Sequence, residues 1–391
     1  MPQKQASSGA LESSRPPRER GRLGTIVSSA GPLVLGIAIA AAMHFTLPKS
    51  IGLFYTKILV DTGIAIILAV SLNVVNGMTG QFSLGHAALM ALGGYTAGML
   101  TRYGSMLIWD SPAVHGGFMG SGSMLFLAAC FLGGCIATVA GYVIGLPSLR
   151  LRGDYLAIVT LGFGEILRVV LQQTNGVIQS ADALRSASRE QLIPPPVGGA
   201  IGFHGVPKYT NLFWVYAFVA LMLVVAFRLK RSSLGRAMIS VREDEFAAQA
   251  MGVNVARIKV LSFMIAAFFA GLAGGLYAHQ GGVIIAPADA GFLRSLDYVL
   301  MTVLGGRGSI SGVVLAAILL TVLPEALREF DQYRLIAYAL LLIFMMLLRP
   351  QGLFGIHEIW DIRPKFSLKN LLIAVTIIAI LLGLYVYSQF S

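Results

Sequence analysis

The stretch "VNGMTGQFSLGHAALMALGGYTAG" (75–98) decides the fold, because it is apolar enough to enter lipid and yet badly suited to a continuous helix. It contains six glycines, and its first half carries the polar residues Asn76, Thr79, Gln81, Ser83 and His86. Hydrocarbon offers no hydrogen bonds, so irregular backbone at membrane depth occurs only inside protein or along a water-filled cavity. We therefore expect this polar run to face a cavity or neighbouring helices.

The overall composition is that of a membrane protein. Hydrophobic residues make up 56% of the 391-residue chain and charged residues only 12%, and the mean hydropathy is +0.76. Soluble domains carry about 25% charged residues, so this chain has too few charges to cover a surface in water. The composition and length predict an all-α fold, a polytopic transmembrane helical bundle of about 10–11 spans, some of them short or broken.

Apolar segments along the chain give the expected spans. They lie at about 29–47, 58–75, 86–101, 124–147, 155–173, 211–228, 260–279, 296–306, 310–326, 335–348 and 370–388. We divide the chain into a disordered basic cytoplasmic tail (1–28), a transmembrane domain (29–355) and a linker with an additional C-terminal span (356–391).

The net charge of +11 comes from basic clusters that lie between the apolar segments. This spacing follows the positive-inside rule and indicates contact with membrane lipid rather than with nucleic acid. It predicts a cytoplasmic N-terminus, and it places the loop 229–259 and the basic stretch 349–369 in the cytoplasm. Both can lie inside only if the short segment 296–306 crosses the membrane. The alternative is a re-entrant loop at 296–306.

No catalytic constellation is visible in the sequence. The glycine-rich "VLGGRGSIS" (303–311) lacks the lysine of a phosphate-binding loop, and Cys130 and Cys135 have no histidines at metal-ligand spacing. We expect no enzyme activity, no metal and no cofactor bound by this chain. Glu165 and Arg168 are three residues apart and share a helix face. They form either an internal ion pair or a substrate contact.

Two further patterns concern packing and the cytoplasmic loop. Small residues recur every four positions in "IAAFFAGLAGGLYA" (265–278), which lets helix backbones approach closely.

In the cytoplasmic loop 229–259, the sequence predicts one helix from Arg236 to Ala250 that ends at Gly252. Such a helix either lies on the membrane surface or is gripped by another protein.

Five motifs resemble those of the permeases of branched-chain amino-acid ABC importers, the LivM-type subunit. They are "TGQFSLGHAALMALGGYTAG" (79–98), "LRLRGDYLAIVTLGFGEILRVVL" (149–171), "GRAMISVREDEFAAQAMGVNVARIK" (235–259), "LGGRGSISGVVLAA" (304–317) and "LRPQGLFG" (348–355). The resemblance implies a multi-pass subunit of the bacterial inner membrane. Its partners would be a second permease, two cytoplasmic ATP-binding subunits that use ATP and magnesium, and a periplasmic substrate-binding protein.

The resemblance and the physics of coupling together assign candidate roles. Contacts with the ATPase are assigned to Gly235, Arg236, Arg242, Glu243, Asp244, Glu245, Ala247, Ala248 and Gly252. The translocation path is assigned to Asn73, Asn76, Gln81, Ser83, His86, Glu165, Gly305 and Gly306, because broken helices present dipoles and free backbone groups to charged substrates.

Three departures from the family pattern leave alternatives open. The outer loop 174–199 is long and charged, an additional span follows the "LRPQGLFG" motif, and the match to the general coupling signature of importers is loose. The substrate could therefore be urea or another small polar or carboxylate solute. A secondary transporter is a further alternative.

Overall fold

The computed structural model describes residues 22–148 and 155–328 and, after these, only positions 336, 339, 340, 343, 347, 352–355 and 358. The tail 1–21, most of the expected span 335–348 and the whole expected span 370–388 lie outside the described residues.

Helices make up nearly all of the regular structure. They are α1 (Arg22–Asn73), the π-helix η1 (Val74–Met78), α2 (His86–Trp109), α3 (Ser121–Ser148), α4 (Tyr155–Gln172), α5 (Ala181–Arg185), α6 (Arg189–Leu192), η2 (Gly199–Ile201), α7 (Leu212–Arg231), α8 (Ser233–Glu243), α9 (Glu245–Ala250), α10 (Val255–Ala278), η3 (Pro287–Ala290), α11 (Phe292–Gly305) and α12 (Ile310–Ala326). Within the described ranges the only β-type pairing is an isolated bridge between Phe203 and Ile285.

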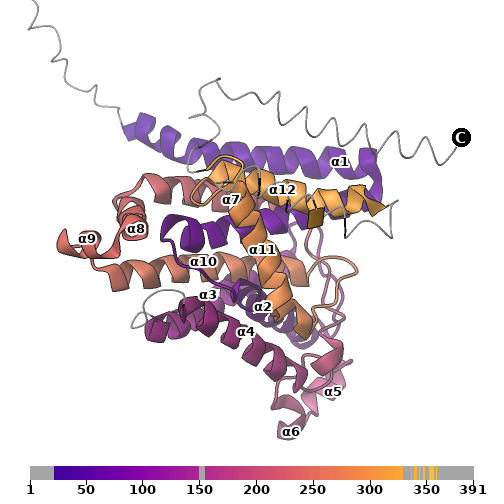
Figure 1. The fold of residues 1–391 in the computed structure, drawn as a ribbon. Coiled ribbons are helices and arrows are strands. Elements are labelled where there is room, and N and C mark those ends of the chain that lie inside the picture. Colours follow the sequence, from indigo (N-terminus) through magenta and orange to yellow (C-terminus); the bar gives the residue numbers. More distant parts are fainter. Residues whose placement is uncertain are drawn as a thin grey trace, which may run out of the picture.

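The long helices form one bundle with two distinct ends (Figure 1). One end carries α8 and α9, and we call it the α8 end; the other carries α5 and α6, and we call it the α5 end. Five stretches in the described ranges are long and apolar enough to cross a membrane. They are Gly31–Pro48, Gly52–Met78, Ser121–Leu146, Leu212–Arg231 and Val255–Ala278. The predicted fold, a polytopic helical membrane bundle, is confirmed.

The N-terminal region differs from the prediction in two ways. Helix α1 begins at Arg22, so residues 22–28, expected in the disordered tail, are helical. The first two expected spans are joined into one 52-residue helix with a kink at Gly52, whose φ of 77° is left-handed and therefore suits glycine. The start of α1 lies at the α8 end of the bundle (Figure 1).

Rows of small residues bring α10 into backbone contact with two helices, as the sequence predicted. A Cβ atom on Gly271 would lie 2.5 Å from the Cβ of Ala137 on α3. A Cβ on Gly275 would lie 2.7 Å from the sulfur of Cys130 on α3, and one on Gly274 would collide with the carbonyl oxygen of Met90 on α2. Close packing of this kind makes the centre of the bundle stiff.

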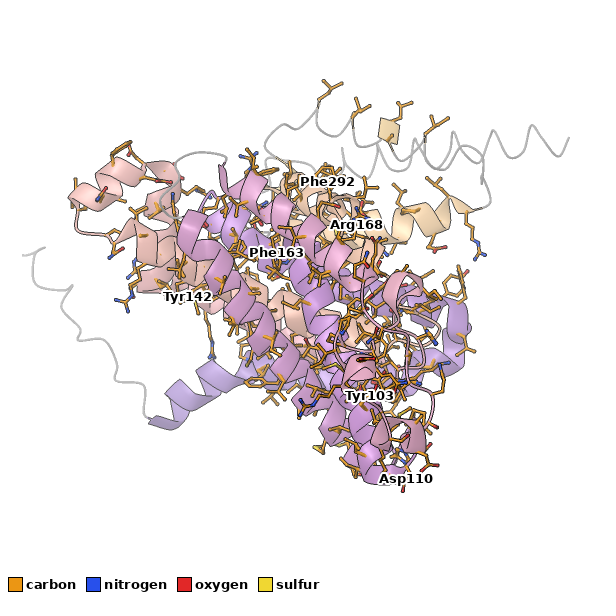
Figure 2. The ribbon with its side chains drawn as sticks, turned by 90° about the horizontal axis from the view of Figure 1, so that it is seen from below. Tyr103, Asp110, Tyr142, Phe163, Arg168 and Phe292 are labelled. Atoms are coloured by element: carbon orange, nitrogen blue, oxygen red, sulfur yellow. The ribbon has the colours of Figure 1, made fainter. Side chains whose placement is uncertain are left out.

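Helix α11 lies inside the bundle, against the start of α2 and the last turns of α1, where Ser295 accepts from the amide of Ala87 and Thr302 donates to the carbonyl of Ala69. Its first residue, Phe292, follows η3, and Figure 2 shows Phe292 beside Arg168 of α4. Its other end is at the α8 end, where the backbone N–H of Leu353 donates to the carbonyl of Leu304 at 2.7 Å. With 14 residues α11 is about 21 Å long, shorter than the hydrocarbon core of about 30 Å. A membrane crossing at 296–306 therefore stays a prediction.

The outer loop 174–205 is packed onto the α5 end. The hydroxyl of Tyr103 donates to the carbonyl of Pro196 at 2.5 Å, and that of Tyr95 donates to the carbonyl of Ile285 at 2.8 Å. Both rings stack on Phe203, with centroids 6.3 Å apart in each pair. Figure 2 shows Tyr103 and Asp110 at this end. The loop is therefore a cap built on aromatic side chains.

Candidate functional site

The opening stretch breaks the helix where the sequence predicted it. Helix α1 ends at Asn73, the π-turn η1 follows, residues 79–85 are irregular, and α2 begins at His86. Side chains replace the lost helical hydrogen bonds: the hydroxyl of Thr79 donates to the carbonyl of Val75 at 2.7 Å, and the amide of Ser83 donates to Oδ1 of Asn76 at 3.3 Å. Because these side chains satisfy the backbone groups, the chain can be non-helical inside the bundle.

A second break, at residues 306–309 between α11 and α12, lies directly against the first. Oδ1 of Asn73 accepts from the amide of Gly308 at 3.0 Å, and Nδ2 of Asn73 donates to the carbonyl of Ser309 at 3.3 Å. Gly308 has a φ of 90°, which a side chain rarely adopts. We call the two breaks together, residues 74–85 and 306–309, the junction. Asn73 is fully buried and holds the junction together.

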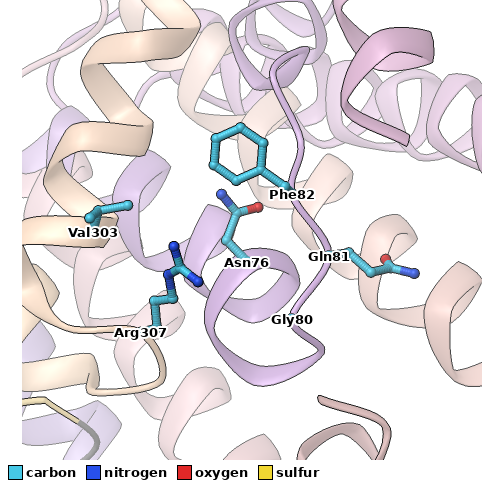
Figure 3. Close-up of a pocket in the computed structure, with 6 residues that line it drawn as sticks. All are labelled: Asn76, Gly80, Gln81, Phe82, Val303 and Arg307. Atoms are coloured by element: carbon cyan, nitrogen blue, oxygen red, sulfur yellow. The ribbon is translucent and has the colours of Figure 1, made fainter. Parts of the chain in front are cut away.

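The junction encloses a cavity of about 320 Å³, which we call the junction cavity. Its lining residues are Asn76, Gly80, Gln81, Phe82, Val303 and Arg307. Figure 3 shows the Asn76 amide between the Phe82 ring and the Arg307 guanidinium, with Gln81 directed away from them. Nδ2 of Asn76 is buried without a hydrogen-bond partner among the described residues. This donor is available to a polar group that enters the cavity.

The remaining predicted path residues take different positions. Ser83 and His86 are buried, and Nε2 of His86 lies 2.8 Å from Oγ of Ser71. Glu165 is away from the junction on α4, where its Oε2 pairs with Nε of Arg168 at 2.7 Å. The ion pair is therefore present, with 36% and 37% of the two side chains exposed, and the alternative of a substrate contact stays a prediction. The junction brings together Asn73, Asn76, Gln81, Ser83, Gly305 and Gly306, but not Glu165. Their role in translocation stays a prediction.

The loop 229–259 contains two helices, so the predicted single helix from Arg236 to Ala250 is wrong. The backbone of Asp244 is extended, with φ −157° and ψ 114°, and it separates α8 from α9. Oδ1 of Asp244 accepts from the amides of Phe246 and Ala247 at 2.8 and 3.0 Å, a helix N-cap. Alanine spacing suggested a continuous helix, but the N-capping preference of aspartate starts a new one.

Gly235 and Gly252 fix the two ends of this loop. A Cβ on Gly235 would collide with the carbonyl oxygen of Leu229, so the tight turn from α7 into α8 requires glycine. Gly252 has a φ of 84° and ends the helical segment, as predicted. Between these ends, Ala248 is buried and Ala247 is exposed. Close contact therefore requires glycine at the start of the loop, and backbone conformation favours it at the end.

Arg242 on α8 connects the loop to the junction. Its Nη1 donates to the carbonyl of Gly77 at 2.9 Å. A Cβ on Gly80 would lie 2.9 Å from Cγ of Arg242, and a Cβ on Gly308 would lie 2.7 Å from Nη1 of Arg242. Arg242 therefore lies between the two breaks, where only glycine leaves room for it. The sequence predicted an ATPase contact for this residue but not its contact with the junction.

Ion pairs hold the other charged residues of the loop. Glu243 pairs with Arg242, with 2.5 Å between Oε1 and Nη2, and Glu245 pairs with Lys259 of α10. The guanidinium of Arg236 donates to the carbonyl of Arg231 at 3.1 Å. Beside them lies a cavity of about 370 Å³ that reaches from Gly80 to residues 241–246. Four of the residues assigned to ATPase contact line this cavity between α8, α9 and the junction: Arg242, Glu243, Asp244 and Glu245.

A second connection to the junction, through Lys230 and Glu358, was not visible in the sequence. Nζ of Lys230 donates to the carbonyl of Gly308 at 2.7 Å and to Oε1 of Glu358 at 2.5 Å. Glu358 also accepts from the amides of Ile310 and Ser311, each at 3.0 Å, at the start of α12. Burial raises the pKa of Glu358, but these hydrogen bonds outweigh burial and hold it below 4.5. With 128 residues between Lys230 and Glu358, no local pattern relates them.

Comparison with known proteins places the chain in a family. The family described as "Branched-chain amino acid transport system / permease component" matches residues 54–349. The permease protein LivM of Escherichia coli (strain K12) is 35% identical over 324 residues, which cover 79% of this chain and 71% of LivM. BraD of Pseudomonas aeruginosa is 30% identical over 299 residues, covering 75% of this chain and 92% of BraD.

A further relative is LivH of Salmonella typhimurium, 28% identical over 303 residues, which cover 75% of this chain and 92% of LivH. All three relatives are named as high-affinity branched-chain amino acid transport system permease proteins. No solved structure matches the chain. On the family match and the identity to LivM, this chain belongs to the family of permease components of branched-chain amino acid transport systems.

Proposed function

We propose that this chain is the membrane-spanning permease of an ATP-driven importer that carries branched-chain amino acids into the cytoplasm. The names of its relatives support the substrate class. The junction supports a path through the bundle, because two broken helices offer backbone groups and an unpaired amide donor beside a cavity.

One observation carries the coupling mechanism: Arg242 joins α8 to both helix breaks. When the ATP-binding subunits close, they displace the α8–α9 hairpin that they grip. The hydrogen bond from Arg242 to Gly77 passes that displacement to the junction, and Lys230 holds the second break to α7. The junction has two conformational states in this mechanism. ATP binding shifts the equilibrium between them to the extent that the closed ATP-binding subunits bind one state more tightly than the other.

We also propose the partners and the cellular location of the chain. Its partners are a second permease of the same family, two ATP-binding subunits, a periplasmic substrate-binding protein and the surrounding lipid. Likeness to both LivM and LivH supports a pair of related permeases. The chain binds no cofactor and catalyses no reaction; ATP and magnesium belong to the ATP-binding subunits. It lies in the bacterial inner membrane with its N-terminus in the cytoplasm, which is consistent with α1 starting at the α8 end.

Uptake in a strain that lacks the transporter tests the substrate. Complementation with the complete transporter should restore uptake of labelled leucine, isoleucine and valine, but not of urea or a short carboxylate. Purification through a tag on this chain should recover the ATP-binding subunits. Recovery of the chain without them, with uptake driven by an ion gradient, would instead identify a secondary transporter.

Arg242 variants test the coupling. Arg242→Ala removes a charge-assisted hydrogen bond worth about 1.5–3 kcal/mol, and we expect uptake to fall at least tenfold while ATP hydrolysis continues. Arg242→Lys keeps the charge but not the geometry and should be intermediate. Arg189→Ala, in the exposed outer loop, is the control. Full uptake by Arg242→Ala would refute the mechanism.

A further inference from the structure

A second cavity, of about 420 Å³, lies between α1, α11 and α12, and we call it the charged cavity. Its lining residues include the ionisable residues Lys57, Asp61, Arg294, Asp297 and Glu325. Charged side chains within transmembrane helices are costly, and they normally face a cavity, a partner or a substrate pathway. Volumes of about 300–1,000 Å³ are usual for small-molecule sites.

The arrangement leaves charges of both signs available to a ligand. Nε of Arg294 approaches Oδ1 of Asp289 at 3.4 Å, and 46% of the Arg294 side chain remains exposed. Asp297, three residues further along α11, lies on the same helix face. Among the described residues, no ion pair within 4 Å joins Arg294 to Asp297, and Asp297 has no other ion-pair partner. The guanidinium and the carboxylate therefore stand side by side without neutralising each other.

The rest of the cavity wall is formed by eight apolar residues and three residues with hydroxyl groups, Tyr277, Tyr298 and Thr321. Its apolar residues are Ile58, Ile64, Ala65, Leu68, Val283, Met301, Leu320 and Pro324. Among these hydroxyls, Oγ1 of Thr321 is buried and has no hydrogen-bond partner among the described residues. A ligand that fits this wall combines a cation, an anion and a branched hydrocarbon group.

Helix α11 lines both the charged cavity and the junction cavity. Met301 lines the former and Val303 lines the latter. Residues two positions apart on a helix do not share a face, so the two cavities border different sides of α11.

We propose that the charged cavity binds the zwitterion of the transported amino acid. Arg294 binds the carboxylate, Asp297 binds the ammonium group, and the apolar wall contacts the aliphatic side chain. This inference rests on the function proposed above and names a binding site for that substrate within this chain.

Chemical protection in the purified complex tests the site without ATP or a binding protein. Thr321→Cys places a thiol on the cavity wall, and we expect saturating L-leucine to slow its reaction with a charged methanethiosulfonate about tenfold. Leucine analogues without the amine or without the carboxylate should protect poorly. The unmodified chain provides the background, because Cys130 and Cys135 are on α3 and do not line the cavity. Equal labelling with and without leucine would overturn the proposal.

Uptake by charge variants provides the second test. Arg294→Gln and Asp297→Asn should each lower the maximal rate of leucine uptake about tenfold or more, since each leaves one substrate charge unpaired. Arg294→Lys should restore part of the rate. Asp110→Asn, which removes an exposed ion pair with Arg185 at the α5 end, is the matched control and should transport normally.

Co-purification separates a substrate site from a subunit interface. The variants should still recover the second permease and the ATP-binding subunits. Loss of the second permease in Arg294→Gln would overturn the substrate site in favour of a contact between subunits. Full uptake by both charge variants would also overturn it. If the unmodified complex imports no branched-chain amino acid, the proposed function itself fails, whereas failure of the variants alone leaves that function standing.

Discussion

The junction and the charged cavity are both polar regions inside an apolar bundle, but their polar groups are arranged in opposite ways. In the junction, Asn73 and Lys230 bind backbone groups of the facing break, and glycines bring the chains into contact. In the charged cavity, Arg294 and Asp297 face open space and form no ion pair with each other.

In the proposed mechanism, this difference separates a part that transmits motion from a part that holds a ligand. Groups that are satisfied by the protein resist displacement, because each broken hydrogen bond leaves a buried group unpaired. Groups that face a cavity exchange partners with little change in the protein. Changes in the junction should therefore affect coupling and stability together, whereas changes in the charged cavity should affect substrate alone.

The largest expected effect comes from Gly252, at the end of the α8–α9 segment that we propose moves the junction. Its φ of 84° cannot be adopted by proline, which fixes φ near −65°. Gly252→Pro should therefore abolish leucine uptake while the protein still inserts in the membrane. Gly252→Ala, which meets no atom within 4 Å and strains the backbone by about 1–2 kcal/mol, should keep most uptake. Normal uptake with proline would remove this loop from the coupling mechanism.

Charge reversal on the α8–α9 hairpin should have nearly the same effect. Glu243→Lys together with Glu245→Lys breaks the ion pairs with Arg242 and Lys259 and places like charges beside them. We expect uptake and substrate-stimulated ATP hydrolysis to be lost, because Arg242 is displaced from the junction. Glu190→Lys, on the exposed helix α6, is the matched reversal at the opposite end and should leave both activities unchanged.

The third effect is smaller and concerns the contact between the two breaks. A Cβ on Gly77 would collide with Oδ1 of Asn73 and lie 2.5 Å from the amide nitrogen of Gly308. Gly77→Ala should therefore lower the free energy of unfolding by about 3 kcal/mol and reduce uptake about tenfold. Gly162→Ala on α4, where nothing lies within 4 Å, should change neither. Thermal unfolding in detergent and uptake rates would show whether stability and uptake depend on close contact between the two breaks.

The sequence predicted the position of the first helix break better than it predicted the side-chain contacts that hold the two breaks together. Glycine and asparagine in an apolar segment locate the interruption at 74–85. The free-energy cost of placing polar groups in lipid can be judged from the residues of that segment alone. The loop 229–259 was also located, but the break at Asp244 was missed, since alanine-rich spacing and an N-capping aspartate favour different structures there.

The partners across the fold could not be predicted in this way. Arg242 bonds to Gly77 across 165 residues, and Lys230 to Glu358 across 128. Neither pair has a spacing that secondary structure alone explains. Arg294 and Asp297 are visible as charges in a short apolar segment, but their cavity exists only because α1 and α12 close around it.

The smallest effect, from Glu358, also tests whether the junction depends on satisfied charges. Its pKa in the folded protein is below the ordinary value of 4.5. The carboxylate therefore stabilises the fold fully above pH 4.5, and this stabilisation is lost as the pH falls through the lowered value. Glu358→Gln should cost about 2 kcal/mol at neutral pH and little once the wild-type carboxyl is protonated. Thermal unfolding of both proteins against pH measures this; a difference that stays constant down to strongly acidic pH would mean that the charge of Glu358 does not hold Lys230 and α12 together.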